Sequence, residues 1–551
     1  MADLRLVGSK LGWVRALAEN PLTRGLLWKV VSQDFHIAEL EALTGAGRGR
    51  VEEVPKPVQG AAPRQWGSGQ SLDLPETPRD TGHKLREAFR SGSTTPVEVL
   101  DAVLGRIDSA DFGPSTHSPW VELDRDGARQ AAEASAKRWA AGEPLGPLDG
   151  LIVPVKDEFH MRGLPTRGGT SWRNQPVDTD AFIVQRLRAG GAVLLGKAHC
   201  TESGLNPLGF NPHFDYPRNV YSEAHGAGGS STGSAVAVGL GMATVAVSTD
   251  GGGSIRIPAA VNGLFGIKPS LQRFGRTGDI WVGSVGHTGP IGQSASDLVD
   301  LMEVCSAPDP GDPLTDFPPD WGAVESTWRP ALGRGIEGCR IGVLRRSMGS
   351  ADSAISSACE AALGALEAEG AVLVDVDFDL LSVVNAVGPL IIAGESAANA
   401  YDDMLAHRHE TGDELRLVYA LMEQISAQQH LRTMRVRTQL RHDLAEALSG
   451  VDLLALPSTG RLASPYALSE NRIEIADTAW TAAMTEHNFL ANLTGVPAAS
   501  VPVGMHAGLP IGLQLIGDAW DEASVLAAVA HLERLGVSQI PLSPGYRSLL
   551  G

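Results

Sequence analysis

Short apolar runs that alternate with helical patterns are the feature that most constrains the fold of this chain. The runs Leu151–Val155, Arg340–Leu344 and Ala371–Val376 are rich in valine, leucine and isoleucine, as buried strands are. Between the last two, Ser353–Ala368 repeats its apolar residues at helical spacing. Strands that alternate with helices predict an α/β fold, with a mixed, mainly parallel sheet covered by helices.

The same alternation continues along the chain. Further strands are predicted at Ala192–Leu195, Ala243–Ser248, Asp452–Leu456, Ala498–Val503 and Leu513–Ile516. Further helices are predicted at Ala235–Leu240 and Glu522–Leu535. A helix is also expected to begin after Thr95, because Thr95 can cap it, Pro96 suits the first helical position and Glu98 can complete a capping box.

Residues 1–80 have a different character. Two amphipathic stretches, around Leu11–Leu17 and Leu26–Leu43, precede a segment rich in glycine and proline from Gly45 to about Pro78. We predict an N-terminal helical extension and linker in residues 1–80, followed by one large domain in residues 81–551. The extension is expected to pack on the body of the protein or on a second subunit.

The charge balance excludes several classes of partner. Lys and Arg number 45 against 64 Asp and Glu, which gives a net charge of −19 and argues against nucleic acid and anionic membranes. Neither a run of about 18 apolar residues nor a signal-peptide pattern is present, so no membrane span is expected. The cysteines are far apart and lack metal-ligand spacing, which predicts free thiols and a cytoplasmic protein without a metal: Cys200, Cys305, Cys339 and Cys359. A homodimer is compatible with this composition.

Two clusters of glycine and serine, Gly228–Ser234 and Asp250–Ser254, are the strongest chemical signal. Consecutive glycines allow successive N–H groups to point into one concavity, which stabilises an anion such as the oxyanion of acyl transfer. A serine at the end of such a loop is a natural nucleophile. Glycine-rich loops are also common as flexible connections, so the clusters alone leave both interpretations open.

A serine nucleophile needs a base. The nearest histidines in the sequence are scattered and are expected to be surface or packing residues: His160, His199, His213 and His225. Lys156 is the other candidate, because it ends an apolar run, and a lysine carried into the interior loses hydration, which favours the neutral amine. An ion pair of Lys156 with Asp157 or Glu158 is the alternative.

Three blocks of sequence resemble the amidase signature family, the Ser-cisSer-Lys amidohydrolases. Lys156 lies in PLDGLIVPVKD, Ser230 in GGSSTGS and Ser254 in STDGGGSIRIPAA. The blocks keep the family order, and Ser230 and Ser254 are 24 residues apart, as in the family. The resemblance extends over most of residues 81–551 and implies a single large amidase-signature domain.

The resemblance also implies the site. Ser254 corresponds to the nucleophile, Ser230 to a bridging serine held by a cis peptide bond, and Lys156 to the base that acts on Ser230. The oxyanion hole would be formed by backbone N–H groups of four residues: Gly251, Gly252, Gly253 and Ser254. We interpret Asp250 and Arg256, which flank the nucleophile, as charges that hold the loop.

Two positions depart from the family pattern. Thr232, which with Ser231 flanks the bridging serine, replaces a glycine, and its larger side chain would either narrow the pocket or pack elsewhere. Gly251 replaces a threonine or similar residue and is expected to loosen the glycine loop. Neither change removes a catalytic group.

Other interpretations of the motifs are weaker. Gly229–Gly233 fits the GxSxG elbow of α/β-hydrolases, with Ser231 as nucleophile, but no strand is predicted just before it. Gly191–Ala198 nearly fits a P-loop, but Ala198 stands where a Ser or Thr would bind Mg²⁺. A non-enzymatic scaffold conflicts with retention of the Lys-Ser-Ser set.

The predicted function is therefore hydrolysis of a small or apolar carboxamide through a serine acyl-enzyme, without a cofactor. Esters could also react, because they give the same acyl-enzyme. The alternative is the glutamine-hydrolysing subunit of an amidotransferase, in which an extension like residues 1–80 is atypical. Residues 380–485 are expected to be mostly helical and to supply much of the pocket, with candidate lining residues Met404, Tyr419, Met422, Trp480 and Met484.

Overall fold

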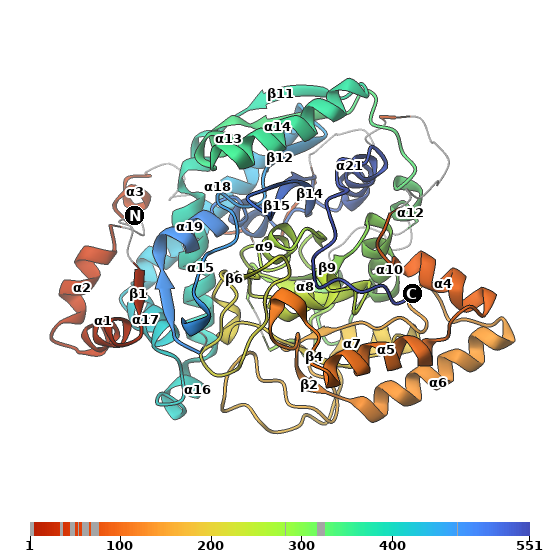
Figure 1. Ribbon diagram of the computed structural model, residues 1–551. Coiled ribbons are helices and arrows are strands. Elements are labelled where there is room, and N and C mark those ends of the chain that lie inside the picture. Colours follow the sequence, from red (N-terminus) through yellow and green to blue (C-terminus); the bar gives the residue numbers. More distant parts are fainter. Residues whose placement is uncertain are drawn as a thin grey trace.

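A mixed sheet of eleven strands runs through the body of the protein (Figure 1). The computed structural model describes residues 5–33, 37–43, 50–52, 54–57, 66–67, 77–280, 283–316, 326–470 and 472–551. In spatial order the strands are β11 (Val372–Val376), β10 (Arg340–Leu344), β12 (Leu453–Pro457), β15 (Leu509–Ile516), β14 (Ala498–His506), β8 (Phe265–Lys268), β9 (His287–Gly292), β7 (Val245–Asp250), β3 (Val155–Lys156), β4 (Gly196–Ala198) and β2 (Trp120–Leu123). The α/β fold is as predicted.

The direction of the strands changes along the sheet. The two parallel groups are β11–β10–β12 near one end and β7–β3–β4 near the other, and the six remaining neighbour pairs of the described sheet are antiparallel. The sheet is thus mixed, with fewer parallel pairs than expected. One cause is the hairpin of β14 and β15, because their two-residue connection, Ala507 and Gly508, leaves no room for a crossover. Both connecting residues have positive φ, as a tight hairpin turn requires.

Most strands and helices coincide with apolar patterns in the sequence. β10 and α14 (Ser353–Ala368) match their predicted bounds, and β11, β12, β14, β15 and α21 (Glu522–Arg534) overlap theirs. The predicted runs Leu151–Val155 and Ala192–Leu195 are mostly irregular; they share one parallel bridge, Ile152–Val193, before β3 and β4 begin. The strands β8 and β9, and the pair β5 (Arg218–Asn219) and β6 (Ser222–Gly226), were not predicted.

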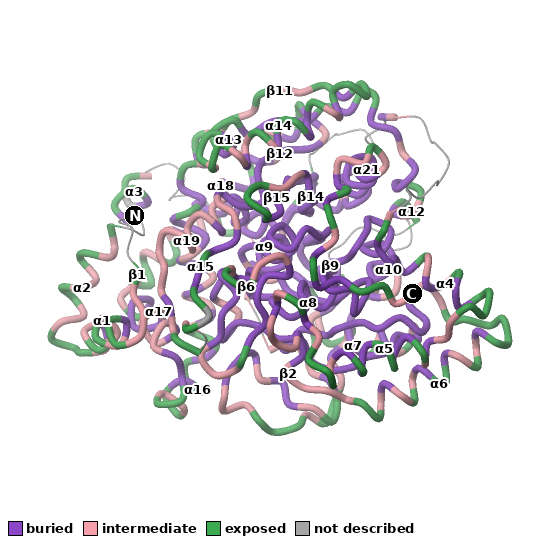
Figure 2. Tube along the Cα trace, in the orientation of Figure 1, coloured by how far each residue is buried: buried purple, intermediate pink, exposed green. Residues whose placement is uncertain are grey.

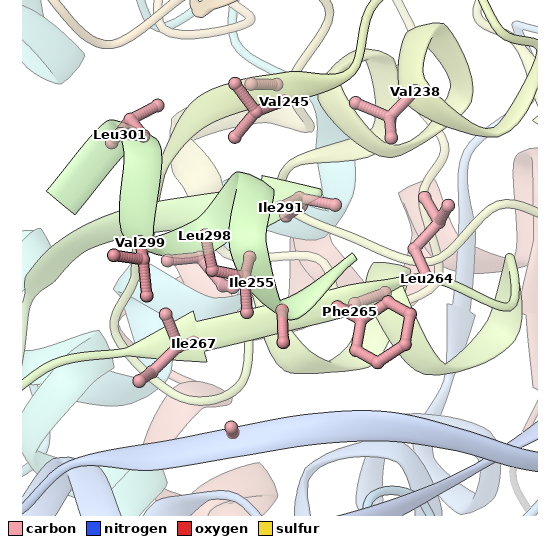
Figure 3. Close-up of a cluster of buried hydrophobic side chains, with 14 of the residues drawn as sticks. Val238, Val245, Ile255, Leu264, Phe265, Ile267, Ile291, Leu298, Val299 and Leu301 are labelled. Carbon is pink, nitrogen blue, oxygen red and sulfur yellow. The ribbon is translucent and has the colours of Figure 1, made fainter. Parts of the chain in front are cut away.

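Two hydrophobic cores lie on opposite faces of the sheet, because side chains alternate along a strand. In β12, Leu453 and Ala455 belong to one core, whereas Leu454 and Leu456 belong to the other. The first core includes α10 (Ala295–Cys305), α14 and α21, and Figure 3 shows Leu298 of α10 beside Ile255 and Ile291. The second core includes α15 (Val384–Asn399), α18 (Ala427–Ser449) and α20 (Phe489–Thr494).

The structure describes further helices. They are α4 (Gly82–Ser91), α5 (Pro96–Asp108), α6 (Arg125–Ala141), α7 (Phe182–Ala189), α8 (Thr232–Gly239), α9 (Arg256–Val261), α12 (Trp328–Ala331), α13 (Arg345–Ser350), α16 (Tyr401–Ala406), α17 (Asp413–Met422) and α19 (Thr478–Thr485). Short 3-10 helices are η2 (Gly113–Ser115), η3 (Glu202–Gly204), η4 (Pro313–Asp316), η5 (Asp379–Val383) and η6 (Leu468–Glu470). Figure 2 shows α8 and α9 buried at the centre of the molecule. Thr95 caps α5 as predicted, accepting a hydrogen bond from the Glu98 N–H at 3.2 Å.

The N-terminal segment forms helices α1 (Ser9–Glu19), α2 (Arg24–Val31) and α3 (Ile37–Ala42). α1 packs against α17, and Glu19 accepts hydrogen bonds from Arg416 at 2.8 Å. β1 (Arg5–Val7) pairs with β13 (Ile475–Asp477). These residues therefore contact the body of the same chain (Figure 1). Most of the predicted linker, Gly45–Pro78, lies outside the described residues, and the boundary at residue 80 stays a prediction.

One segment of the described chain, Asp379–Asn399, is long and apolar enough to cross a membrane by length and composition. It consists of η5 and α15, and 56% of its most apolar window is buried within the protein. α15 packs against α17, α18 and α20. The segment is thus a core helix of this fold.

Candidate active site

Lys156 is buried on an inner strand near one end of the sheet. It lies on β3, which runs parallel to its neighbours β4 and β7, with Lys156 opposite Ala198 and Val155 opposite Val247. The lysine side chain is fully buried. The apolar run therefore carries an amine into the interior, as the sequence predicts, although regular strand structure is limited to its last two residues.

The amine of Lys156 contacts three side chains. Its Nζ lies 2.7 Å from Ser230 Oγ, 2.7 Å from Thr249 Oγ1 and 3.1 Å from Glu158 Oε2. Thr249 donates a hydrogen bond to the Glu158 carboxylate. Both sequence interpretations of Lys156 are therefore met in part, because the amine faces the bridging serine and is also paired with Glu158.

Asp157, the other acidic candidate, points elsewhere. Its carboxylate accepts a hydrogen bond from Lys197 Nζ at 2.8 Å, and burial raises the pKa of Asp157 despite this partner. Lys197, which belongs to the near-match to a P-loop, is likewise buried on β4. It is thus part of an internal ion pair and is not a phosphate ligand.

The first glycine–serine cluster forms the turn before α8. The Gly229–Ser230 peptide bond is cis, as the resemblance implies for the bridging serine. Gly229 has no room for a side chain, since a Cβ there would lie 2.4 Å from the carbonyl oxygen of Asn206. Thr232 donates to the Gly228 carbonyl at 2.9 Å, so its hydroxyl packs within the turn and leaves the cavity unchanged.

Ser231 is turned away from the cavity, because its hydroxyl donates to the backbone carbonyl of Thr249 at 3.2 Å. The expectation that no strand precedes this serine is wrong, since β6 lies just before it and pairs with β5. β6 lies outside the main sheet, and Ala227, Gly228 and Gly229 separate it from Ser230. The orientation of Ser231 therefore argues against the nucleophile elbow.

The second cluster connects β7 to α9 and presents Ser254. Gly253 has φ of 115°, which a side chain would disfavour. Its N–H donates to Asp250 Oδ1 at 2.7 Å, so this member of the predicted oxyanion hole is engaged inside the loop. Among the described residues, no protein acceptor takes the N–H groups of Gly251, Gly252 and Ser254, which leaves three donors.

Asp250 and Arg256 form a fully buried ion pair behind this loop. The Asp250 carboxylate accepts from Arg256 Nη2 at 2.9 Å and from the Ile255 N–H at 3.1 Å. Burial opposes ionisation of Asp250, but the Arg256 guanidinium outweighs it and lowers the pKa of Asp250 below its usual value. Arg256 also donates to Asn488 O at 3.1 Å and to Asn492. These contacts fix the ends of the glycine loop.

Ser230, Ser254 and Gly251 line one cavity that encloses about 500 Å³, part of it open to solvent. Its charged lining residues are Glu158, Arg276, Asp279 and Glu395, and its apolar side chains are Leu205, Val285 and Ile392. The other lining residues are Ser203, Gly204, Thr249, Gly283, Gly286, Ser396 and Asn399. Four charged residues thus border the cavity, although most of its exposed wall is apolar.

The predicted lining residues lie in the core instead. Met404 and Tyr419 share one small core cluster, Met422 packs with α15 and α18, and Met484 packs against Trp480. The region 380–485 contributes to the cavity through α15. Ile392 on that helix occupies the space above Gly251, since a Cβ on Gly251 would lie 2.8 Å from Ile392 Cδ1.

The histidines named from the sequence take no part in this cavity. His213 contacts Glu202 at 2.7 Å, and His160 contacts Thr166 at 3.2 Å. Burial lowers the pKa of His199 to about 4. Sequence reasoning did not identify Thr249 or Ile392 as lining the site. Thr249 could have been found, because it precedes Asp250 on the strand beside Lys156.

A serine-dependent acyl-transfer enzyme needs a nucleophilic serine, a base and donors that stabilise the oxyanion. Here a buried lysine contacts one serine, and a second serine lies in a glycine loop with free N–H groups. The family described as Amidase matches residues 98–526. The chain therefore belongs to the amidase signature family and is an amidase-family hydrolase.

Named relatives include two kinds of enzyme. A fatty acid amide hydrolase of Oryza sativa subsp. indica is 32% identical over 464 residues, covering 83% of this chain and 76% of the relative. A glutamyl-tRNA(Gln) amidotransferase subunit of Roseiflexus sp. (strain RS-1) is 34% identical over 471 residues, covering 80% and 93%. The crystal structure of a bacterial aryl acylamidase superposes with a TM-score of 0.74 at 27% identity, covering 83% of this chain and 96% of that one.

Proposed function

We propose that this protein hydrolyses a small carboxamide through an acyl-enzyme on Ser254. The observation that carries the proposal is the 2.7 Å contact between Lys156 Nζ and Ser230 Oγ, at a cavity that Ser230 and Ser254 line together. A neutral lysine at this position can accept a proton from Ser230, and Ser230 can accept one from Ser254.

In the first half-reaction Ser254 Oγ attacks the amide carbonyl carbon. Its proton passes to Ser230, which gives its own proton to Lys156. The oxyanion is stabilised by N–H groups of the glycine loop, where the donors of Gly251, Gly252 and Ser254 are open. The C–N bond then breaks, and the leaving nitrogen takes a proton back from Lys156 through Ser230.

In the second half-reaction water attacks the acyl-enzyme. The same relay accepts the proton of water, the bond between the acyl carbon and Ser254 Oγ breaks, and Ser254 recovers its proton. The carboxylic acid leaves. Ester substrates lead to the same acyl-enzyme, so we also propose a side esterase activity.

The size of the cavity supports a small substrate. Its empty space is about 500 Å³ including the part open to solvent, and Ile392 closes it above Gly251. Buried polar groups lose hydration unless a ligand pairs with them. Among the charged lining residues, Arg276 is paired with Asp279 and Glu158 with Lys156, so these groups do not by themselves require a polar substrate.

A glutamine-hydrolysing subunit of an amidotransferase is the second candidate, because relatives of that kind are 33–34% identical, close to the 32% of the fatty acid amide hydrolase. The two candidates differ in whether ammonia is released or passed to a partner. Release of ammonia from simple amides by the purified chain, faster than from glutamine, supports the hydrolase. Co-purification with a second protein, together with a preference for glutamine, would favour the alternative.

Ser254→Ala tests the proposal directly. It is expected to abolish both turnover of amides and accumulation of an acyl-enzyme, detected as a mass increase of the intact protein. Amidase activity like that of the unmodified protein in this variant would refute the assignment. The cytoplasmic location, the absence of nucleic-acid and metal partners and the homodimer stay predictions.

A further inference from the structure

Glu158 is a buried carboxylate that the proposed relay does not use. It is 1% exposed and lines the same cavity as Ser230 and Ser254. Its Oε2 contacts Lys156 and Thr249, while its Oε1 is buried without a hydrogen-bond partner among the described residues. A buried carboxylate is costly unless its charge is compensated, and the lysine beside Glu158 is the group that can compensate it.

Backbone geometry places Glu158 there. The Glu158 N–H donates to the Lys156 carbonyl at 2.7 Å, which closes a tight turn immediately after β3. The Phe159 N–H donates to the same carbonyl at 3.2 Å. The turn returns the Glu158 side chain to the amine two residues earlier.

The three oxygen contacts of Lys156 can be made either by an ammonium, which has three N–H donors, or by the neutral amine that the proposed relay requires. A neutral amine has two N–H donors and one lone pair. The Thr249 hydroxyl donates to Glu158, so its oxygen can accept one N–H of Lys156, and Glu158 Oε2 can accept the other. The lone pair is then left for the third neighbour, Ser230 Oγ, at 2.7 Å.

We propose that Glu158, with Thr249 as its link, is a positioning residue that directs the Lys156 lone pair at Ser230 and stabilises the ammonium formed when Lys156 accepts a proton. This inference rests on the proposed hydrolase. Proton transfer converts a neutral amine beside a carboxylate into an ammonium–carboxylate pair. The attraction within that pair is strong because the site is poorly hydrated.

Other charged groups near Lys156 and Glu158 have partners of their own. Asp157 is paired with Lys197, Asp250 with Arg256, and Asp279 with Arg276. Glu395, across the cavity, accepts hydrogen bonds from Ser284. Burial raises the pKa of the Cys200 thiol, and the charges of Glu158 and Asp157 add to this rise. Glu158 is thus the carboxylate placed to act on Lys156.

Glu158→Gln removes the charge and keeps the shape. We expect kcat/KM at the optimum to fall by about 10–100-fold, because the ammonium loses its partner. We also expect the acidic limb of the pH profile of kcat/KM to move to lower pH by about one unit, because the carboxylate no longer favours protonation of the resting amine. A structural defect would lower the rate without moving this limb.

Glu395→Gln is the matched control, because it removes another carboxylate from the same cavity wall and should leave the position of the acidic limb unchanged. Melting temperatures establish that the variants fold. If Glu158→Gln does not fold, Thr249→Val should slow the reaction and Thr249→Ser should restore it, since the hydroxyl at position 249 links the carboxylate to the amine beside their direct contact.

The inference is overturned if Glu158→Gln folds and keeps the wild-type limb, or if Thr249→Val is as active as Thr249→Ser. Both outcomes leave the hydrolase intact, provided that Ser254→Ala is inactive. Activity in Ser254→Ala would instead refute the proposed function itself. The two failures are therefore distinguishable.

Discussion

Ile392 closes the cavity beside the glycine loop, and Ile392→Ala tests the size limit that we propose. The Ile392 side chain occupies the space that a Cβ on Gly251 would need, at 2.8 Å from its Cδ1. The substitution removes three carbon atoms from the cavity wall and opens room for an acyl chain longer by about three methylenes.

The magnitude follows from the transfer of these methylenes out of water. At about 0.8 kcal/mol for each buried methylene, three contribute about 2.4 kcal/mol. This corresponds to a gain of about 50-fold in kcat/KM for the longer amide relative to the shorter one. The variant is also expected to lose about 2–4 kcal/mol of stability, because Ile392 packs in part against the core formed by α15, α18 and α20.

The assay is ammonia release from a series of straight-chain primary amides of increasing length. Ile391→Ala is the matched control, because Ile391 is the preceding residue of α15, is fully buried in the same core and does not line the cavity. The reasoning is refuted if Ile392→Ala leaves the preferred length unchanged, or if Ile391→Ala shifts it equally.

Three further predictions concern the relay, the glycine loop and the response to pH. Lys156→Arg keeps the charge but cannot give up its proton, so kcat/KM should fall by about 10²–10⁴-fold in a steady-state assay; retention of most activity would exclude a neutral amine as base. Asp250→Asn leaves the buried Arg256 guanidinium without a charged partner and should cost about 3–5 kcal/mol, measured as a lower urea midpoint; an unchanged midpoint would contradict the structural role. Burial raises the pKa of Glu414 to about 8, although Asn206 donates to its carboxylate. In the unfolded chain the same carboxyl group ionises at lower pH, so the free energy of unfolding should fall as pH rises from about 4.3 to 8. Glu414→Gln should therefore flatten the dependence of the melting temperature on pH over that range, and an unchanged slope would argue against a neutral Glu414.

The fold was predictable where apolar patterns coincide with regular elements. Arg340–Leu344 and Ser353–Ala368 are read directly from apolar composition and helical spacing. Strand direction was harder, because the central antiparallel order depends on contacts between distant segments. The β8–β14 pair, for example, joins residues 265–268 with residues 498–500. β8 and β9 contain glycine, proline and lysine, which weaken the strand signal.

Ser230 and Ser254 line one cavity and Lys156 contacts Ser230, and these three residues correspond to three ordered sequence blocks. The engaged Gly253 N–H could not be read from the sequence, because it depends on where the Asp250 carboxylate points. Glu158 was considered only as an ion-pair partner that would argue against a base. The structure places it with Thr249 and Ser230 around the same amine, so pairing and base function are compatible.

The identity of the nucleophile is tested most directly by covalent labelling with a serine-directed fluorophosphonate, followed by peptide mass spectrometry. The account predicts a single adduct on Ser254 and none in Ser254→Ala. Lys156→Arg should label much more slowly, because its relay cannot accept the proton. An adduct on Ser231, or hydrolysis of amides by Ser254→Ala, would contradict the account.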